Sequence, residues 1–202
     1  MTTTRVHHAL ALSALLLGGP SLAFAQAGMA GMDMSSHIVI PKGAIITVAD
    51  VEFMQGMIAH HAQAIYMSRM AAAHGANARV LRLANKIDQS QVAEIAIMQG
   101  WLRRYNQNAP DTSSWHHMQM PGMLTAAQLK ELDAASGVAF DRSFLSMMIQ
   151  HHEGALKMVD DLFAAPLAAQ DADVYAFAND VVAVQTAEIG IMQSLLRELP
   201  RS

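Results

Sequence analysis

The side chains in this sequence best suited to chemistry are two pairs of adjacent histidines, each preceded by a methionine. On a helix, residues three and four positions apart share a face, so each methionine would lie beside its two histidines. Thioether sulfur is a soft ligand and imidazole a borderline one, a combination that suits Cu(I) and Cu(II). Zinc and iron would add thiolates or carboxylates to the histidines. The candidate copper ligands are Met57, His60, His61, Met148, His151 and His152.

Neighbouring positions on an α-helix point about 100° apart. One histidine of each pair can therefore face the interior and the other a groove or a neighbouring helix, and the spacing does not say which one ligates. Two glutamates, Glu94 and Glu188, recur in a second motif. A buried carboxylate needs a partner, so we expect both to accept hydrogen bonds from the histidines and to orient the rings. The alternative is that both glutamates are solvated at the surface.

A third group of ligand-type residues lies in a connector at residues 106–124. Two histidines and three methionines fall close together there, and a Pro-Gly turn holds them. An ordinary loop has no reason to expose so many thioethers to water, and the mixture again suits copper. The candidate ligands of the connector are His116, His117, Met118, Met120 and Met123.

Both histidine pairs belong to an internal repeat. Residues 53–61 read Phe-x3-Met-Ile-x-His-His and match residues 144–152, while residues 91–99 read Gln-x2-Glu-Ile-x2-Met-Gln and match residues 185–193. Two matches in the same order predict a duplicated helical hairpin. Two such hairpins bury their apolar stripes together as an all-α four-helix bundle, which we expect over residues 47–200.

Start and stop signals place the elements of this bundle. Thr47 and Asp50 have the spacing of a capping box. A short helix should begin at Thr125. The long helices are expected at about residues 47–73, 77–105, 139–165 and 171–199. The second helix is expected to bury a stripe of Val80, Leu83, Ala84, Ile87, Val92, Ile95 and Met98.

Residues 1–25 have the order of a secretory signal peptide. Arg5 precedes an apolar run at residues 9–17, and an Ala-x-Ala cleavage pattern ends at Ala25. The run is too short to span a bilayer, so cleavage after Ala25 would leave a periplasmic protein that is not inserted in the membrane. An uncleaved anchor is the alternative. Residues 26–46 form a methionine-rich leader without apolar periodicity, which we expect to be flexible.

Composition narrows the class of function further. The chain has 16 methionines, 10 histidines, no cysteine and a net charge of −4. In an exported chain, the lack of cysteine excludes disulfides, zinc-thiolate sites and thiol redox chemistry. An acidic balance without a basic run argues against nucleic acid as a partner. Handling of a soft metal is the function that this composition favours.

These motifs resemble the domain-of-unknown-function family 305 (DUF305). The likeness covers about residues 47–198 and rests on the doubled Phe-x3-Met-Ile-x-His-His motif and on the Met-Pro-Gly-Met sequence at residues 120–123. The resemblance implies a ferritin-like four-helix bundle that binds copper in the periplasm and contributes to copper resistance. The chain has no Glu-x-x-His motif, which di-iron bundles use, so the fold would not bring ferroxidase chemistry.

Three functions follow as hypotheses. The first is a non-enzymatic copper-binding protein that sequesters or shuttles the ion, exchanging it with other periplasmic copper-handling proteins. The second is a copper-dependent redox enzyme that oxidises Cu(I). Such an enzyme needs an open coordination position and a nearby acid or base, for which Glu94 and Glu188 are the repeated candidates. The third is a structural helical envelope protein without metal, whose methionines fill the core.

Overall fold

The computed structural model describes Met1 and residues 38–200. This part of the chain is all-α, and within it no helix combines the length and the hydropathy needed to cross a bilayer. Its helices are α1 (Val48–Ala73), α2 (Ala78–Arg104), a short 3₁₀ helix η2 (Ser114–His116), α3 (Ala126–Ala134), α4 (Gly137–Ala164) and α5 (Ala172–Glu198). The expected signal peptide and most of the expected leader lie outside the described residues.

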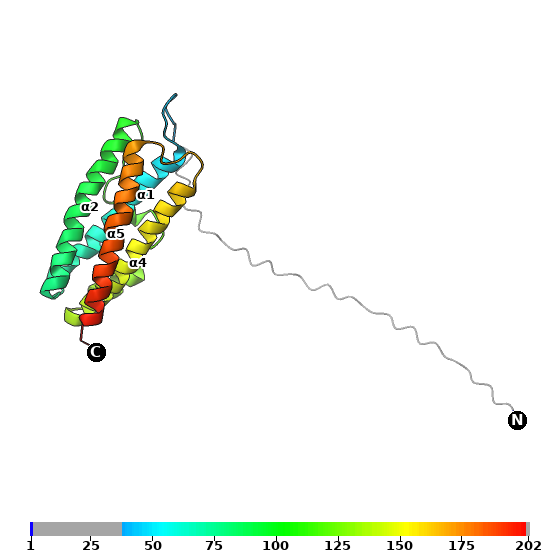
Figure 1. Cartoon of the computed structure of the whole chain (residues 1–202). Helices are drawn as coiled ribbons and strands as arrows, with labels where there is room; N and C mark the ends of the chain where they lie inside the picture. Colours follow the sequence, from blue (N-terminus) through cyan, green and yellow to red (C-terminus); the bar gives the residue numbers. More distant parts are fainter. Residues whose placement is uncertain (2–37, 201–202) are drawn as a thin grey trace. The chain divides into compact units, whose positions relative to one another are not determined.

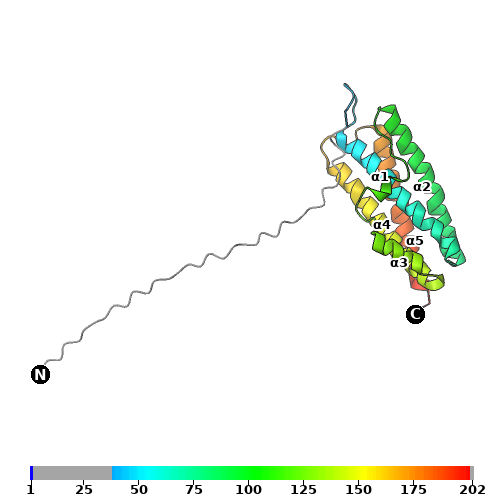
Figure 2. The same cartoon turned by 180° about the vertical axis from the view of Figure 1, so that it is seen from behind.

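The four long helices form the expected bundle, which confirms the predicted fold class (Figure 1). α1 packs against α2 as one hairpin, α4 packs against α5 as the other, and α1 and α4 join the two hairpins. Short α3 lies against α4, as the view from behind shows (Figure 2). The observed helix ends fall within a few residues of those that the sequence predicts.

Side-chain caps explain where the helices begin. The Thr47 N–H donates to the Asp50 carboxylate at 2.7 Å, and the Asp50 N–H donates to the Thr47 hydroxyl at 3.2 Å. Thr47 and Asp50 thus form the expected capping box, with aspartate in the place of the usual glutamate. Asp171 caps α5 and also accepts from Trp101 Nε1 at 3.0 Å and Tyr105 Oη at 2.7 Å. One carboxylate therefore ties the end of α2 to the start of α5.

The end of the expected leader is packed onto the bundle. Ile46 is buried, and Ile38 and Ile40 pack against the core. Gln107 Nε2 donates to the Val39 carbonyl oxygen at 2.9 Å. The three isoleucines explain why this segment packs on the bundle, because their burial removes apolar surface from water.

The core consists of two apolar clusters. One contains Phe53 and Trp101, and the other contains Phe140 and Phe144. Along α2, α4 and α5, a short polar stretch separates the residues of one cluster from those of the other. On α1, His60 and His61 interrupt the first cluster shortly before the second begins. The bundle interior is therefore apolar at both ends and polar between them.

One position of the predicted stripe on α2 was wrong. Val92 is 46% exposed, whereas its neighbour Gln91 is 2% exposed. The buried face runs from Ile87 through Gln91 to Ile95 in steps of four residues, close to the helical period. Val92 falls outside that line, and hydrophobicity alone gave the wrong residue.

Candidate metal centre

A layer of polar side chains crosses the bundle between the two apolar clusters. Each long helix contributes two residues to this polar layer: His60 and His61, Gln91 and Glu94, His151 and His152, Gln185 and Glu188. All are buried except Glu94, whose side chain is 22% exposed. Burying polar groups is unfavourable unless each finds a partner. The polar layer therefore needs an explanation beyond core packing.

The centre of the polar layer is a contact between two imidazoles. His60 on α1 and His151 on α4 have ring centroids 3.7 Å apart. His60 Nε2 lies 3.1 Å from the carbonyl oxygen of Pro121. Because a carbonyl oxygen only accepts, this contact makes Nε2 the donor and leaves the lone pair of neutral His60 on Nδ1.

Both central histidines are held neutral. Burial, followed by the charges of His61 and His152, lowers the pKa of His60 to about 3. Burial and the neighbouring histidines also lower the pKa of His151 well below its usual value. Neutral imidazole is the form that ligates metals, since the protonated ring has no free lone pair.

The outer histidines each contact a glutamate of their own hairpin. His61 Nε2 lies 2.6 Å from a Glu94 oxygen, and His152 Nε2 lies 2.9 Å from a Glu188 oxygen. Lys86 Nζ lies 3.4 Å from the other oxygen of Glu188. Donation of one ring nitrogen to a carboxylate orients an imidazole and raises the basicity of the other nitrogen. Thus one histidine of each pair faces the opposite hairpin, and the other faces a glutamate.

Five buried imidazole nitrogens have no hydrogen-bond partner within the described part of the chain. They are His60 Nδ1, His61 Nδ1, His152 Nδ1 and both ring nitrogens of His151. Buried polar atoms are paired in the great majority of cases. A neutral imidazole has one N–H and one nitrogen with a free lone pair, so each of these four rings can offer one nitrogen to a metal. A borderline or soft metal fits such donors.

The histidines do not converge on one point. Ring centroids lie 6.5 Å apart between His60 and His61 and 6.4 Å apart between His151 and His152. Among residues 38–200, no three His, Asp or Glu side chains are close enough to hold one ion together. A site built from nitrogen and oxygen ligands alone, as zinc or a di-iron centre prefers, is therefore absent from this region as it stands.

The predicted methionine ligands lie on the two sides of the polar layer. Met57 is fully buried in the same apolar cluster as Phe53, and Met148 is fully buried in the same cluster as Phe144. The structure does not bring these two sulfurs into one cluster. Each remains one helical turn from the histidines that follow it in its own helix.

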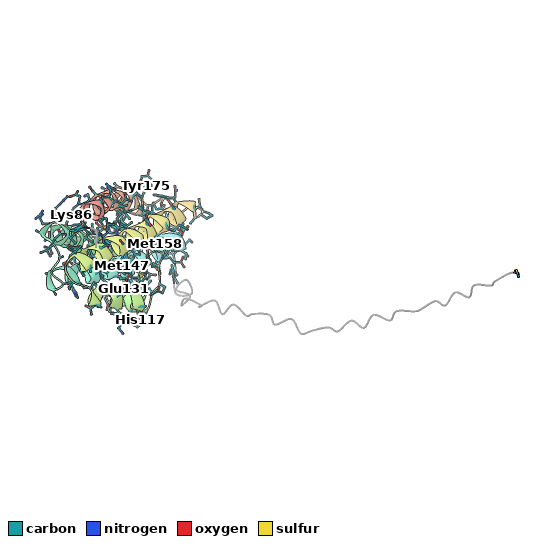
Figure 3. The ribbon with its side chains drawn as sticks, turned by 90° about the horizontal axis from the view of Figure 1, so that it is seen from below. Lys86, His117, Glu131, Met147, Met158 and Tyr175 are labelled. Atoms are coloured by element: carbon teal, nitrogen blue, oxygen red, sulfur yellow. The ribbon has the colours of Figure 1, made fainter. Side chains whose placement is uncertain are left out.

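The structure separates the ligand-type residues of the connector. His116 and His117 are exposed, and the His116 ring stacks on Trp115 with centroids 3.9 Å apart. His117 lies on the opposite side of the bundle from Tyr175 (Figure 3). Met118 and Met120 are half-buried and Met123 is buried. The connector therefore presents its two histidines to solvent and its later methionines to the bundle.

The linker segment (residues 120–124) is fixed over the groove between α1 and α4. Gln63 donates to the Leu124 carbonyl oxygen at 3.1 Å and accepts from the Leu124 N–H at 2.7 Å. Gly122 has a φ of +77° and packs directly on Gly154 of α4. Sequence reasoning missed Gln63 and Gly154, whose only signals in the sequence were a glutamine and a glycine inside predicted long helices.

Two further buried residues carried a signal that sequence reasoning left without a role. Gln91 and Gln185 each lie three residues before a glutamate of the polar layer and occupy matching places in the repeat. Each is 2% exposed, and the side-chain oxygen of each has no partner among the described residues. Their repetition and burial assign both glutamines to the same polar layer as the histidines.

The fold and the site define a class of protein: a bundle of two helical hairpins with a buried layer that contains four histidines. The chain belongs to the DUF305 family, which is described as a domain of unknown function. The family model matches residues 50–196 of this chain. This confirms the family that the doubled histidine motif indicated. A search of curated protein sequences gives no significant match.

Solved structures with the same fold include two bacterial DUF305 proteins. A DUF305 protein described as secreted, from Streptomyces coelicolor, is 31% identical, with a TM-score of 0.66, over 74% of this chain and 93% of its own. A DUF305 fragment from Deinococcus radiodurans is 30% identical, with a TM-score of 0.67, over 76% of this chain and 99% of its own.

The chain is also similar to CopM. In its Cu(I)-bound form, CopM is 27% identical to this chain, with a TM-score of 0.60, over 74% of this chain and 96% of its own. CopM has also been solved in Cu(II)-bound, silver-bound and apo forms. A protein with this fold therefore binds monovalent and divalent coinage-metal ions.

Proposed function

We propose that this protein binds copper and sequesters or shuttles it, without catalytic turnover, as part of copper homeostasis. The observation that carries the proposal is the set of five unpaired imidazole nitrogens in the polar layer. The copper-bound and silver-bound structures of the similar protein CopM support the choice of metal.

The residues of the polar layer would have two different roles in binding the ion. His60 and His151, at the contact between the hairpins, would supply ring nitrogens to it. Glu94 and Glu188 would orient His61 and His152 through the hydrogen bonds already in place. Small rotations of buried rings and thioethers would bring the donors together, and Cu(I) accepts low coordination numbers that such a set can supply. Further proposed ligands are Met57, Met148, His116, His117, Met118, Met120 and Met123.

We place this function in the periplasm, after removal of residues 1–25. The amino-terminal pattern of a signal peptide supports this location, as does the similarity to a DUF305 protein described as secreted. The partners would be copper ions and other periplasmic copper-handling proteins. Exposed His116 and His117 are the proposed contact for exchange of the ion, because they are the candidate ligands that solvent reaches directly.

An anaerobic titration with Cu(I) against a chromogenic chelator tests the proposal. The variant His60→Gln/His151→Gln keeps a hydrogen-bond donor for the Pro121 carbonyl but removes both central imidazoles. We expect it to bind Cu(I) at least about tenfold more weakly than the unmodified protein, a change of about 1.4 kcal/mol. The matched control, His116→Gln/His117→Gln, should retain tight binding in the bundle.

The proposal fails if the unmodified protein does not compete for Cu(I), or if the His60→Gln/His151→Gln variant competes equally well. Circular dichroism must show that both variants keep the helical content of the parent protein. In a separate assay in air, where oxygen can accept the electrons, sustained conversion of added Cu(I) to Cu(II) by the protein, abolished by Glu94→Gln, would instead identify a redox enzyme.

A further inference from the structure

A surface pocket of about 360 Å³ opens in the groove between α1 and α4, beside the polar layer. Two thioethers, those of Met120 and Met158, line it together with Phe53 and Leu162. Met158 belongs to α4 (Figure 3) and Met120 to the linker segment. Neither sequence spacing nor the internal repeat had connected these two methionines.

A glycine brings the two thioethers close together. A Cβ atom at Gly56 of α1 would lie 2.9 Å from the Met120 sulfur and 3.3 Å from the Met158 terminal methyl. Both side chains therefore converge on the bare backbone of one helical turn. A glycine inside a helix is unfavourable compared with alanine, and here it leaves the space that the two thioethers occupy.

The neighbouring methionine of the linker segment plays a different part. The Met120 N–H donates to the Met123 sulfur at 3.3 Å. This contact engages the Met123 sulfur within the turn and fixes the backbone from which the Met120 side chain extends. Met120 and Met158 are consequently the pair of sulfurs that faces the pocket.

The mouth of the pocket is acidic. Glu52 and Asp161 line it, and both side chains are exposed. Asp161 also pairs with Lys157. Carboxylates at the rim of a pocket raise the local concentration of cations, while thioethers inside it select a soft ion over a hard one.

The pocket lies next to the central histidines. Gly56 precedes His60 by one helical turn on the same face of α1. Pro121 follows Met120 directly, and its carbonyl oxygen contacts His60 Nε2 at 3.1 Å. An ion bound by the two thioethers would thus be one helical turn from the His60–His151 contact.

We propose that Met120 and Met158 form a loading site for a soft monovalent cation, Cu(I) or Ag(I), from which the ion passes to the polar layer. This inference rests on the proposed function for the identity of the cargo. The two sulfurs bind the ion, the acidic rim attracts it, and Gly56 keeps the space open.

Silver nitrate and the full chain labelled with [¹³C-methyl]methionine provide the test. We expect the methyl signals of Met120 and Met158 to shift at the first substoichiometric additions of Ag(I), while those of buried Met98 and Met192 stay in place. The variant Met120→Leu/Met158→Leu, close in volume to the parent, should lose one bound equivalent of Ag(I). The control Met98→Leu/Met192→Leu should lose none.

A second variant keeps both sulfurs but fills the space over Gly56 that they occupy. Gly56→Ala places a methyl group where the Met120 sulfur lies, and the flexible thioethers can move aside without unfolding the helix. We expect it to weaken the early methyl shifts of Met120 and Met158. The variant His60→Gln/His151→Gln should retain those shifts, because the loading site lies outside the polar layer.

Two outcomes overturn the inference and remain distinguishable. If the protein binds Ag(I) but the Met120 and Met158 methyl signals do not move, and their leucine variant binds the same number of ions, the loading site is refuted while the proposed function stands. If the unmodified protein binds no Ag(I) or Cu(I), both proposals fail.

Discussion

At the scale of the residue, the histidines of the polar layer are buried, and the two central ones, His60 and His151, are neutral. Pro121 holds the ring of His60 through a backbone carbonyl, whereas Glu94 and Glu188 hold the rings of His61 and His152 through carboxylates. Burial, followed by the neighbouring histidines, lowers the pKa of both central rings well below the usual value of histidine. This arrangement keeps nitrogen lone pairs ready for a metal and makes the fold sensitive to acid.

We expect the stability of the metal-free protein to fall as the pH falls below about 6.5. The folded-state pKa of His60 is lowered from 6.5 to about 3, and that of His151 is lowered as well. The unfolded chain therefore binds more protons over this interval. Each histidine should contribute a slope of about 1.4 kcal/mol per pH unit. Urea denaturation at several pH values between 7 and 4 measures this dependence of the unfolding free energy on pH.

In the variant His60→Gln/His151→Gln, the pH dependence of the unfolding free energy should lose the contribution of the two central histidines. The control His116→Gln/His117→Gln, which changes exposed histidines, should keep that contribution. An equal slope in all three proteins would show that the central rings are not responsible. Stability is complete above the unfolded-state pKa, so a comparison at pH 8 isolates the cost of the substitutions themselves.

The two glutamates of the polar layer should differ in their effect on stability. Glu188→Ala leaves the buried Nε2 of His152 without its partner, a loss of about 1–3 kcal/mol. Glu94→Ala should cost less, because the Glu94 side chain is 22% exposed and water can replace the carboxylate beside His61. Urea denaturation at pH 7 measures both values. Equal costs would contradict the difference in burial.

At the scale of the element, the linker segment connects the two hairpins at the candidate site. It lies over the α1–α4 groove, where Gln63 binds its backbone on one side and Gly154 admits it closely on the other. It supplies the carbonyl that orients His60 and the thioether of the proposed loading site. Its position depends on a close backbone approach that only glycine allows.

Gly154→Ala should therefore destabilise the protein by about 1–3 kcal/mol, as overpacking does. The added Cβ would lie 2.1 Å from the Pro121 carbonyl oxygen, so the linker segment must shift away from α4. The matched control is Gly190→Ala in α5, where a Cβ meets nothing within 4 Å. That variant should be stabilised by about 0.5–1 kcal/mol, because alanine suits a helix better.

Thermal or urea denaturation compares the two glycine variants. Chemical modification of His60 and His151 by diethyl pyrocarbonate should also be faster in Gly154→Ala, because a displaced linker segment uncovers the central rings. Stabilisation of both variants to the same extent would show that the linker segment does not need the bare backbone of Gly154.

At the scale of the whole molecule, the bundle is two apolar clusters with a polar layer between them. The clusters and the shared Asp171 cap hold the hairpins together. The polar layer instead leaves buried nitrogens unpaired, which is unfavourable without a ligand. A bound ion would relieve that penalty at the histidines of α1 and α4.

Copper should consequently raise the melting temperature. A ligand at a free concentration of about 100 times its Kd stabilises the native state by about 2.7 kcal/mol. For a domain of this size the corresponding shift in Tm is about 5–10 °C. Anaerobic differential scanning calorimetry with Cu(I) measures it. The variant His60→Gln/His151→Gln should show a much smaller shift, and an unchanged Tm of the unmodified protein would contradict the proposal.

The sequence by itself determined the helices, the doubled histidine motif and the softness of the candidate ligands. These features are local: caps such as Thr47 and Asp50 and the helical period act within a few residues. The repeat also indicated that two equivalent hairpins meet. Val92 shows where this reasoning ends, because the buried face followed the helical period to Gln91 rather than the more apolar residue.

Only the tertiary structure decided which partners meet. It assigned His60 to His151 and His61 to Glu94, placed the Pro121 carbonyl on His60, and paired Met120 with Met158 over Gly56. These contacts join residues far apart in the chain, and several use backbone atoms or the absence of a side chain, which residue types do not reveal. Spacing within one helix sets the direction of a side chain, but the packing of the hairpins sets what that side chain contacts.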